Sequence, residues 1–519
     1  MDKQVSDRRP LRVLIEMRAA LDKHAGIPQQ TRLLFRGLSL LDGVRLEGLI
    51  QSSTHSLTSG LPGGLDERER LPRDRQIDRL ARIVIMLEQK FLRSHLSVIP
   101  MMLRRMIGRC EKLTRFDPQP FSDFIWRRLF ARSLPVDDFN VVTKAGYRIT
   151  NTPWTTMHIG GLISKDFGGA LFPRLDTKDF DVMIAETPYP ATIAQRTQLV
   201  IRYHDAIPLL LPHTISDRRY HQGSHYQALR RNVTGGAWFV CVSDATRKDL
   251  LTVFPQAESR SITIHNIVSH DYFDEDSSPV QVPEIIKARL NHRTHRKIDR
   301  SHLEAIYDSA KDAGVLKYLL VVSTVEPRKN HLSLLSAWER LRTRQCPQLK
   351  LIVVGSLGWH HTSITRKFRP WLERGEAFML EDVPSPELRL LYKHARATVC
   401  PSFAEGFDLS GVEAMKSGGV VLASDIPVHR EVYADGVEYF NPYSVEDLVH
   451  AISTAIDTSR TALREEMIRR GRIISRRYEF SEIMPQWQEF LSAVAARSPR
   501  IAGHAHIPSS PPDLIELRS

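Results

Sequence analysis

Short apolar runs alternate with segments of helical length along most of the chain. Most of these runs are continuous and rich in β-branched residues, a pattern typical of strands in a parallel sheet that is buried on both faces. The runs lie at 11–15, 181–184, 198–203, 238–242, 262–264, 318–322, 349–354, 397–400 and 419–423. Helical segments between them, such as 331–341 and 385–395, supply the crossovers that parallel strands need. The pattern predicts an α/β protein with two doubly wound, Rossmann-like domains.

The boundary between the domains is expected in the polar and charged stretch from 271 to 316, which includes a predicted helix over 301–311. The end of the chain is rich in Pro and Ser, a composition typical of disorder. The expected parts are an N-terminal domain (1–275), a C-terminal domain (276–475), a helix that packs back on the N-terminal domain (476–498) and a disordered tail (499–519).

A helical insertion of about 55–135 interrupts the alternation in the first half. Its residues 73–115 are basic and amphipathic, with Arg and Lys interleaved among apolar positions. Such a segment favours contact with an anionic membrane surface, and Pro100 is expected to split it into two helices. The alternative is an insertion that packs on its own domain and turns a basic face to solvent.

The composition is that of a folded protein with more than one domain. With 519 residues, of which 42% are hydrophobic and 25% charged, the chain is too long for one core and too apolar for general disorder. No apolar run approaches the roughly 20 residues of a membrane span. The first ten residues lack the apolar core of a secretory signal, so we expect a cytoplasmic protein. The net charge of +12 favours polyanionic partners.

The four cysteines carry no visible chemistry. Cys110, Cys241, Cys346 and Cys400 are scattered, without a C-x-x-C pair or a nearby set of histidines. This spacing predicts neither a zinc site nor a disulfide framework. It is typical of buried thiols in a reducing cytosol.

The strongest chemical signal is the segment 401–418, which follows the predicted strand 397–400. Ligands of open α/β sheets bind at the carboxyl ends of strands, where a following helix presents free N–H groups and a partial positive charge. Gly406 lets the backbone approach a bound group, so this loop can hold a diphosphate. Glu405 and Glu413 can accept hydrogen bonds from the hydroxyls of a sugar ring or a ribose.

These two carboxylates also have structural interpretations. Residues 410–413 fit a capping box, in which Glu413 only reaches back to the N–H of Ser410. Glu405 can be a solvated carboxylate in a loop. The sequence pattern alone leaves both alternatives open.

A second signal is Glu326-Pro-Arg-Lys-Asn330, where a strand runs into a loop and then a helix. Arg328 and Lys329 project from the carboxyl end of that strand. Arginine suits bidentate contacts with phosphate, and lysine acts as a point charge. The alternative is a solvated basic turn in which Asn330 is an ordinary helix N-cap.

Together these segments resemble the retaining glycosyltransferases of family 4, which have the GT-B fold. The hallmark of that family is Glu, seven residues and a second Glu, which Glu405 and Glu413 match. The resemblance covers most of 11–50 and 180–495 but not 51–175. Further matching segments lie at 26–31, 203–208, 326–331, 353–359, 390–392 and 424–431.

The resemblance implies a metal-independent, retaining transfer of a hexose from a nucleotide sugar, with no other cofactor. It assigns Glu405 to the transferred sugar, Glu413 to the ribose, and Arg328 and Lys329 to the departing diphosphate. His204 is expected to line the sugar from the N-terminal domain. Further residues implied in donor binding are Ser323, Gly355, Gly406, Phe407, Asp408 and Leu409. The loop implied for the acceptor or diphosphate contains Gly26, Ile27 and Gln29.

The sequence departs from the family in several places. The family often has Gly at position 408, where Asp408 adds a carboxylate beside the expected diphosphate, and Pro at positions 410 and 420. Ser323 and Thr324 stand where the family has Gly-Arg. Arg328 is therefore expected to replace that arginine.

The form of the 326–330 motif is similar to mannosyltransferase-like members, which suggests GDP-mannose as the donor. A lipid-linked saccharide acceptor at the inner face of the plasma membrane would account for the basic insertion, and bacterial surface polysaccharide or lipopolysaccharide assembly is the expected setting. Aromatic residues are 8% of the chain and do not interleave with a basic patch, so no nucleic-acid partner is expected. Two alternatives are a sugar-nucleotide epimerase of the same fold and a non-catalytic scaffold that binds a nucleotide or polyanion.

Overall fold

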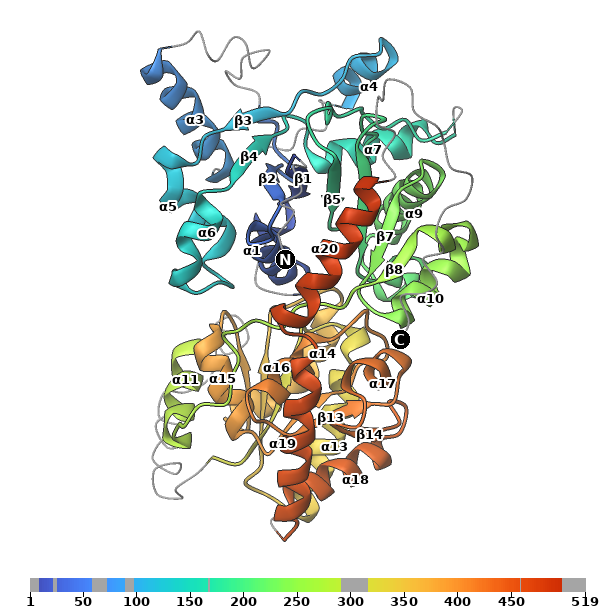
Figure 1. Cartoon of the computed structure of the whole chain (residues 1–519). Helices are drawn as coiled ribbons and strands as arrows, with labels where there is room; N and C mark the ends of the chain where they lie inside the picture. The colour runs from blue at the N-terminus through green and yellow to red at the C-terminus, as the bar shows by residue number, and fades with distance from the viewer. Residues whose placement is uncertain are drawn as a thin grey trace, which may run out of the picture.

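The computed structural model describes residues 9–21, 26–57, 72–88, 98–166, 169–290, 316–457 and 459–496. Figure 1 shows two α/β domains, one above the other, with the chain passing through the upper domain first. The helix expected at 301–311 and the tail expected at 499–519 lie outside the described residues. The predicted fold class is confirmed, since each domain is built on a largely parallel sheet.

The first domain contains a sheet with the strand order β3-β4-β2-β1-β5-β6-β7-β8. All neighbouring strands are parallel except β3, which runs antiparallel to β4. The strands are β1 (Leu11–Glu16), β2 (Val44–Ile50), β3 (Thr114–Phe116), β4 (Gly146–Ile149), β5 (Val182–Ala185), β6 (Gln198–Tyr203), β7 (Trp238–Cys241) and β8 (Ser261–Thr263).

The apolar pattern did not reveal β2 and β4, and a buried ion pair explains why. Glu47 on β2 accepts a hydrogen bond from Arg148 on β4 at 2.6 Å, and each side chain is only 4% exposed. Charged residues at buried positions interrupt the apolar runs by which these strands would be recognised. Paired in this way, the two charges satisfy each other inside the sheet.

Helices cover both faces of the first sheet (Figure 1). They are α1 (Ile27–Ser39), α3 (Arg73–Glu88), α4 (Val98–Met106), α5 (Ser122–Ile125), α6 (Phe139–Thr143), α7 (Trp154–Ser164), α8 (Ile207–Leu210), α9 (Arg218–Thr234) and α10 (Asp244–Val253). Among the described residues, no helix combines the length and apolar character needed to cross a lipid bilayer.

The second domain is built on a parallel sheet of order β11-β10-β9-β12-β13-β14. Its strands are β9 (Tyr318–Val322), β10 (Lys350–Val354), β11 (Ala377–Leu380), β12 (Ala397–Cys400), β13 (Val421–Ser424) and β14 (Glu438–Phe440). Its helices are α11 (Val282–Arg289), α13 (His331–Arg344), α14 (His361–Glu373), α15 (Ser385–His394), α16 (Leu409–Lys416), α17 (Pro427–Tyr433), α18 (Val445–Ile456) and α19 (Thr461–Arg476). On β9, Leu320 packs into one apolar cluster while Leu319 and Val321 pack into another, so the strand is buried on both faces.

The last described helix, α20 (Phe480–Ala496), crosses back over the first domain (Figure 1). Its apolar side belongs to the same cluster as β1 and α1. Trp487 is fully buried there. The core of the first domain is therefore completed by residues from the end of the chain.

Two expectations about the insertion are wrong. Pro100 lies in the first turn of α4 and not between two helices. This position tolerates proline, because an N–H in the first turn has no partner within the helix. Cys110 is exposed, unlike the buried Cys241 and Cys400. Residues 89–97, between α3 and α4, lie outside the described residues.

We predict that Trp487→Ala destabilises the protein by about 3–5 kcal/mol, because it removes a large, fully buried side chain from the core of the first domain. Urea unfolding followed by far-ultraviolet circular dichroism measures the change. The exposed neighbour Gln488 provides the matched control Gln488→Ala. Equal shifts of the unfolding midpoint in both variants would contradict the role of α20 in this core.

Candidate active site

A cavity of about 460 Å³ lies between the two domains, beside the carboxyl ends of their strands. Every candidate site residue from the sequence lines it. These residues are Gly26, Ile27, Gln29, His204, Ser323, Arg328, Lys329, Gly355, Glu405, Gly406, Phe407, Asp408, Leu409 and Glu413. The structure thus brings together residues from both halves of the chain, while the role of each one stays a prediction.

Two cations meet one carboxylate at the centre of this cavity. Glu405 lies 2.8 Å from Nη1 of Arg328 and 2.5 Å from Nζ of Lys329, and its side chain is only 7% exposed. Burial alone would raise the pKa of Glu405, but the charges of Arg328 and Lys329 outweigh burial and lower it. The expectation of a solvated loop carboxylate is therefore wrong. Glu405 also holds two like charges side by side.

Arg328 has further hydrogen-bond partners besides Glu405. Its guanidinium donates to the carbonyl of Ala404 at 2.6 Å and to Glu326 at 2.8 Å. The alternative of a solvated basic turn is wrong, because both basic side chains are largely buried. Asn330 does begin α13, but its side-chain amide donates to the carbonyl of Pro442 at 3.0 Å and does not cap the helix.

Gly406 is required by the close approach of the two domains. A Cβ atom at this position would lie 1.8 Å from the carbonyl oxygen of His204. The carbonyl of Gly406 accepts hydrogen bonds from the hydroxyls of Ser243 at 2.7 Å and Thr246 at 3.2 Å. The group that lies close to Gly406 is thus the backbone of the first domain. The sequence had suggested that a bound ligand would lie there.

Glu413 is held by side chains from distant parts of the chain. It accepts hydrogen bonds from the amide of Gln29 at 3.0 Å and from the hydroxyl of Tyr392 at 3.1 Å. The capping box is wrong, because the N–H of Ser410 is directed to Asp408 and not to Glu413. Burial raises the pKa of Glu413 to about 7, although the hydrogen bonds from Gln29 and Tyr392 act in the opposite direction.

Asp408 is the N-cap of α16 and uses part of the helix N-terminus. Its carboxylate accepts from the N–H of Ser410 at 3.3 Å and lies 3.2 Å from Nε2 of His429. Burial opposes its ionisation, but the hydrogen bond from His429 and the charge of Lys329 lower its pKa. This cap takes one of the free N–H groups that the sequence assigned to a diphosphate. Phe407 next to it is buried against Tyr478, with ring centroids 5.2 Å apart.

The other predicted residues form the walls. The hydroxyl of Ser323 lies 3.2 Å from Nε2 of His331, whose pKa burial lowers to about 4. Gly355 faces the carbonyl of Ser323, which a Cβ atom would approach to 2.1 Å. Gly26 precedes α1 with a φ of +49°, a conformation that glycine adopts readily.

Sequence reasoning missed Glu186, which follows β5 and is fully buried. Its Oε2 lies 3.0 Å from Nε2 of His204, while its Oε1 has no hydrogen-bond partner among the described residues. Burial lowers the pKa of His204 although Glu186 opposes the shift, so the imidazole is neutral. The carboxyl-end rule that identified Glu405 would also have identified Glu186.

Glu186 lines a second pocket of about 260 Å³ that adjoins the main cavity. The two share Ile27, His204, Asp205 and Arg328. Trp359 from the second domain closes one side. The space between the domains therefore has two connected parts. The described residues include no group of three or more His, Cys, Asp or Glu placed to hold a metal ion.

Residues 309–473, which include Arg328, Lys329, Glu405 and Glu413, match the family model described as glycosyl transferases group 1. The second domain of the chain is therefore similar to this family. The expected resemblance to the family is thereby confirmed.

Curated proteins that this chain resembles over part of its length are mannosyltransferases. The serotype-specific mannosyltransferase WbdA of Escherichia coli is 34% identical over 26% of this chain and 16% of its own length. The O-antigen chain mannosyltransferase B of Escherichia coli is 27% identical over 45% of this chain and 55% of its own length. RfbU of Salmonella typhimurium, also an O-antigen chain mannosyltransferase, is 26% identical over 42% of this chain and 65% of its own length. Each match spans less than two thirds of the relative.

Solved structures show that this chain has the GT-B fold. Sucrose-phosphate synthase from Thermosynechococcus elongatus aligns with a TM-score of 0.55 at 12% identity, over 94% of this chain and all of that one. Alr3699/HepE from Anabaena, in complex with UDP-glucose, aligns with a TM-score of 0.53 at 13% identity, over 93% of this chain and 100% of that one. At such identities the likeness concerns the fold.

We predict that nucleoside diphosphates bind more tightly as the pH rises through about 7. The carboxyl of Glu413 ionises in that range in the ligand-free protein, and its charged form accepts stronger hydrogen bonds from ribose hydroxyls. Titration calorimetry with GDP and UDP between pH 5.5 and 8.5 measures this. In the Glu413→Gln variant, the pH dependence of the affinity that remains is due to ionisation of the nucleotide's own phosphate. The same pH slope in both proteins would reject the assignment of Glu413 to the ribose.

Proposed function

We propose that this protein is a retaining hexosyltransferase that moves a sugar from a nucleoside-diphosphate donor to a saccharide acceptor. The observation that carries the proposal is the cluster of Arg328, Lys329 and Glu405 inside the cavity between the domains. Glu413 lies in the same cavity at a place suited to a ribose. The match of residues 309–473 to the family model supports the same chemistry.

The departing diphosphate gains negative charge as its bond to the sugar breaks. Arg328 and Lys329 are the cations that meet this charge. Their positions are fixed in advance by Glu405, so little reorganisation is needed during the reaction. Asp408 already occupies an N–H at the start of α16, which leaves the two side chains as the main source of stabilisation.

Retention is inferred from the similarity to the family, and the state of Glu405 argues against a covalent intermediate. A carboxylate held by two cations and with a lowered pKa is a weak nucleophile. The acceptor hydroxyl therefore attacks from the face on which the diphosphate leaves, with no covalent sugar–enzyme intermediate. Glu405 instead binds hydroxyls of the transferred sugar.

The acceptor enters through the smaller pocket beside His204. His204, which Glu186 holds at 3.0 Å, forms a hydrogen bond with an acceptor hydroxyl and thereby orients it. Trp359 offers an apolar ring face to the acceptor sugar. Because the pocket shares Arg328 with the donor cavity, the acceptor hydroxyl and the leaving phosphate lie next to each other.

The donor is GDP-mannose, and the product is part of a bacterial surface polysaccharide. The support is that the curated relatives WbdA, mannosyltransferase B and RfbU are all mannosyltransferases, and the last two are assigned to O-antigen chains.

The enzyme docks on a membrane that carries its lipid-linked acceptor, through α4. Ile99, Leu103 and Met106 recur on one face of this helix, Ile107 directly follows it, and all four are 56–73% exposed. The opposite face anchors it, with Met101 buried in the core of the first domain. Figure 1 places α4 at the end of the first domain that is remote from the second, so docking there leaves the cleft open.

The basic residues of α4 do not have the membrane-binding role that the sequence suggested. Arg104 pairs with Glu111 at 2.9 Å, and Arg105 donates to the carbonyl of Phe172 at 3.1 Å. They hold the helix on its domain, whereas Arg109 is exposed just after it. Membrane binding therefore depends mainly on the apolar face of α4, and electrostatic attraction contributes less.

We predict that Lys329→Ala lowers the rate of mannosyl transfer by roughly 10²–10³-fold, the effect typical of losing one critical donor to a developing charge. The fold persists, because Arg328 still pairs with Glu405. Release of nucleotide from a panel of GDP-, UDP- and ADP-sugars in the presence of oligosaccharide acceptors measures turnover, and Lys248→Ala on the exposed side of α10 is the control. Saturable binding without turnover for every donor would favour the scaffold alternative.

We predict that the protein sediments with vesicles containing anionic lipid and that the double change Leu103→Gln and Met106→Gln prevents it. Both side chains are exposed, so the fold should tolerate the change. The matched control replaces Val136 and Ile163, exposed apolar residues elsewhere on the domain, with glutamine. Docking through α4 would be contradicted if the wild-type protein did not sediment with these vesicles. An equal loss of sedimentation in both double variants would also contradict it.

A further inference from the structure

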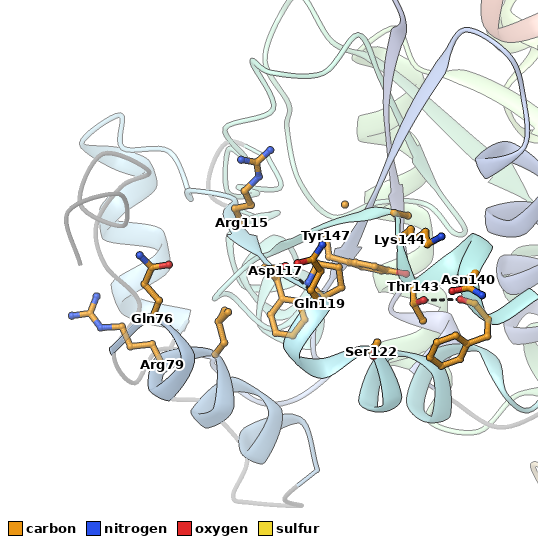
Figure 2. A pocket seen from close by; sticks show the side chains of 16 residues that line it. Gln76, Arg79, Arg115, Asp117, Gln119, Ser122, Asn140, Thr143, Lys144 and Tyr147 are labelled. Carbon is orange, nitrogen blue, oxygen red and sulfur yellow. Dashed lines mark hydrogen bonds between the residues drawn. The ribbon is translucent and has the colours of Figure 1, made fainter. Parts of the chain in front are cut away.

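Charged side chains converge in the cleft but not in the other large hollow of the described residues. That hollow, a cavity of about 800 Å³ beside β4, has Arg79, Arg115 and Lys144 in its lining. Figure 2 shows these three side chains pointing away from one another, so they make no common site. The charges that act together lie around the loop 401–408 in the cleft.

The cavity between the domains is lined by more acidic than basic side chains. The basic ones are Arg132, Arg328 and Lys329, and the acidic ones are Asp205, Glu381, Asp382, Glu405, Asp408 and Glu413. A nucleoside diphosphate is an anion, so each uncompensated carboxylate near its phosphates weakens binding. Glu405 is compensated by Arg328 and Lys329. Asp408, on the same loop, needs a cation of its own.

Both oxygens of Asp408 are engaged within the second domain. Oδ1 accepts hydrogen bonds from the N–H of Ser410 at 3.3 Å and from its hydroxyl at 2.7 Å. Oδ2 lies 3.2 Å from Nε2 of His429 on α17. The side chain of Asp408 is only 7% exposed, and that of His429 is fully buried. The carboxylate that lines the cavity is therefore held from behind by a buried histidine.

The other ring nitrogen of His429 also faces an acceptor. Nδ1 lies 2.9 Å from the carbonyl oxygen of Ser424, at the end of β13, and 3.1 Å from its hydroxyl. That hydroxyl donates its own proton to the carbonyl of Ser402 at 2.5 Å, so toward the ring it can only accept. A carbonyl oxygen and an ionised carboxylate accept but do not donate. Both nitrogens of His429 therefore carry protons, and the ring is a cation.

The surroundings of His429 suit a positive charge. The ring of Tyr433 stacks on the imidazole with centroids 5.0 Å apart, a distance at which an aromatic face attracts a cation. Burial opposes the ionisation of Asp408, but the hydrogen bond from His429 and the charge of Lys329 lower its pKa. The pair of Asp408 and His429 is thus a buried ion pair whose remaining hydrogen-bonding groups are satisfied.

We propose that His429 is a positioning residue for the donor: it cancels the charge of Asp408 and holds this carboxylate turned away from the diphosphate. His429 acts through Asp408, since it does not itself line the cavity. Lys329 is then left to the leaving phosphate. The pair also explains how the site accommodates a carboxylate where the family often has glycine. The role in binding rests on the proposed function, whereas the charge of His429 rests on hydrogen-bond geometry.

Calorimetric titration of the full chain with GDP and UDP tests the role in binding. His429→Gln keeps a donor toward Asp408 but removes the charge, and we expect it to weaken the nucleotide that binds best about ten-fold. In an Asp408→Asn background the same change should cost about two-fold at most, because no carboxylate is left to compensate. Asparagine tolerates the φ of +62° at position 408. The matched control is His394→Gln on α15, whose ring lies 3.0 Å from the hydroxyl of Ser277.

Nuclear magnetic resonance of ¹⁵N-labelled histidine rings in the wild-type protein tests the charge, whether or not His429→Gln folds. At a pH of about 8, above the ordinary histidine pKa of about 6.5, one ring is expected to carry protons on both nitrogens. In Asp408→Asn that ring should lose one of them. Absence of a doubly protonated ring that responds to Asp408→Asn would overturn the proposal.

The titrations also separate this proposal from the proposed function. An equal loss of affinity from His429→Gln in both backgrounds would show a merely structural role, and no loss in the wild-type background would likewise overturn the proposal, while nucleotide binding itself remained intact. A wild-type protein that binds neither GDP nor UDP would overturn the proposed function as well. Binding with the expected coupling but without sugar transfer would reject the transferase and leave the role of His429 standing.

Discussion

The carboxylate of Glu405 is the group on which the rest of the cleft depends. Arg328 and Lys329 are neighbours in sequence and would repel each other in a largely buried place. One shared counter-charge keeps both side chains aligned toward the space where a ligand enters. The loops after β9 and β12 are thereby joined through an electrostatic contact, and the position of each loop is set by the other.

The same loop also determines how the two domains meet. Gly406 follows Glu405 and lies against the backbone of His204, while Glu431 on α17 accepts the N–H groups of Asp244 and Ala245 at 2.7 and 3.0 Å. The first contact is a close backbone approach, and the second joins α17 of one domain to the start of α10 in the other. A change in the angle between the domains must therefore disturb the charged cluster.

The sequence predicted the two-domain fold and the residues that gather in the cleft, because both follow from short motifs placed after strands. It could not predict which groups those residues contact. Glu413 is bound by Gln29 from the opposite domain, a pairing that depends on how the domains meet. The strands β2 and β4 were hidden by the buried pair of Glu47 and Arg148.

The return of α20 to the first domain has a consequence for biosynthesis. The cluster around β1 includes Trp487 and Phe490, so it lacks part of its apolar surface until the ribosome has made the whole second domain. At about 5–20 residues per second, that interval is on the order of tens of seconds. During this time the first domain exposes an unfilled groove, and a chaperone that shields such surfaces is expected to bind the nascent chain.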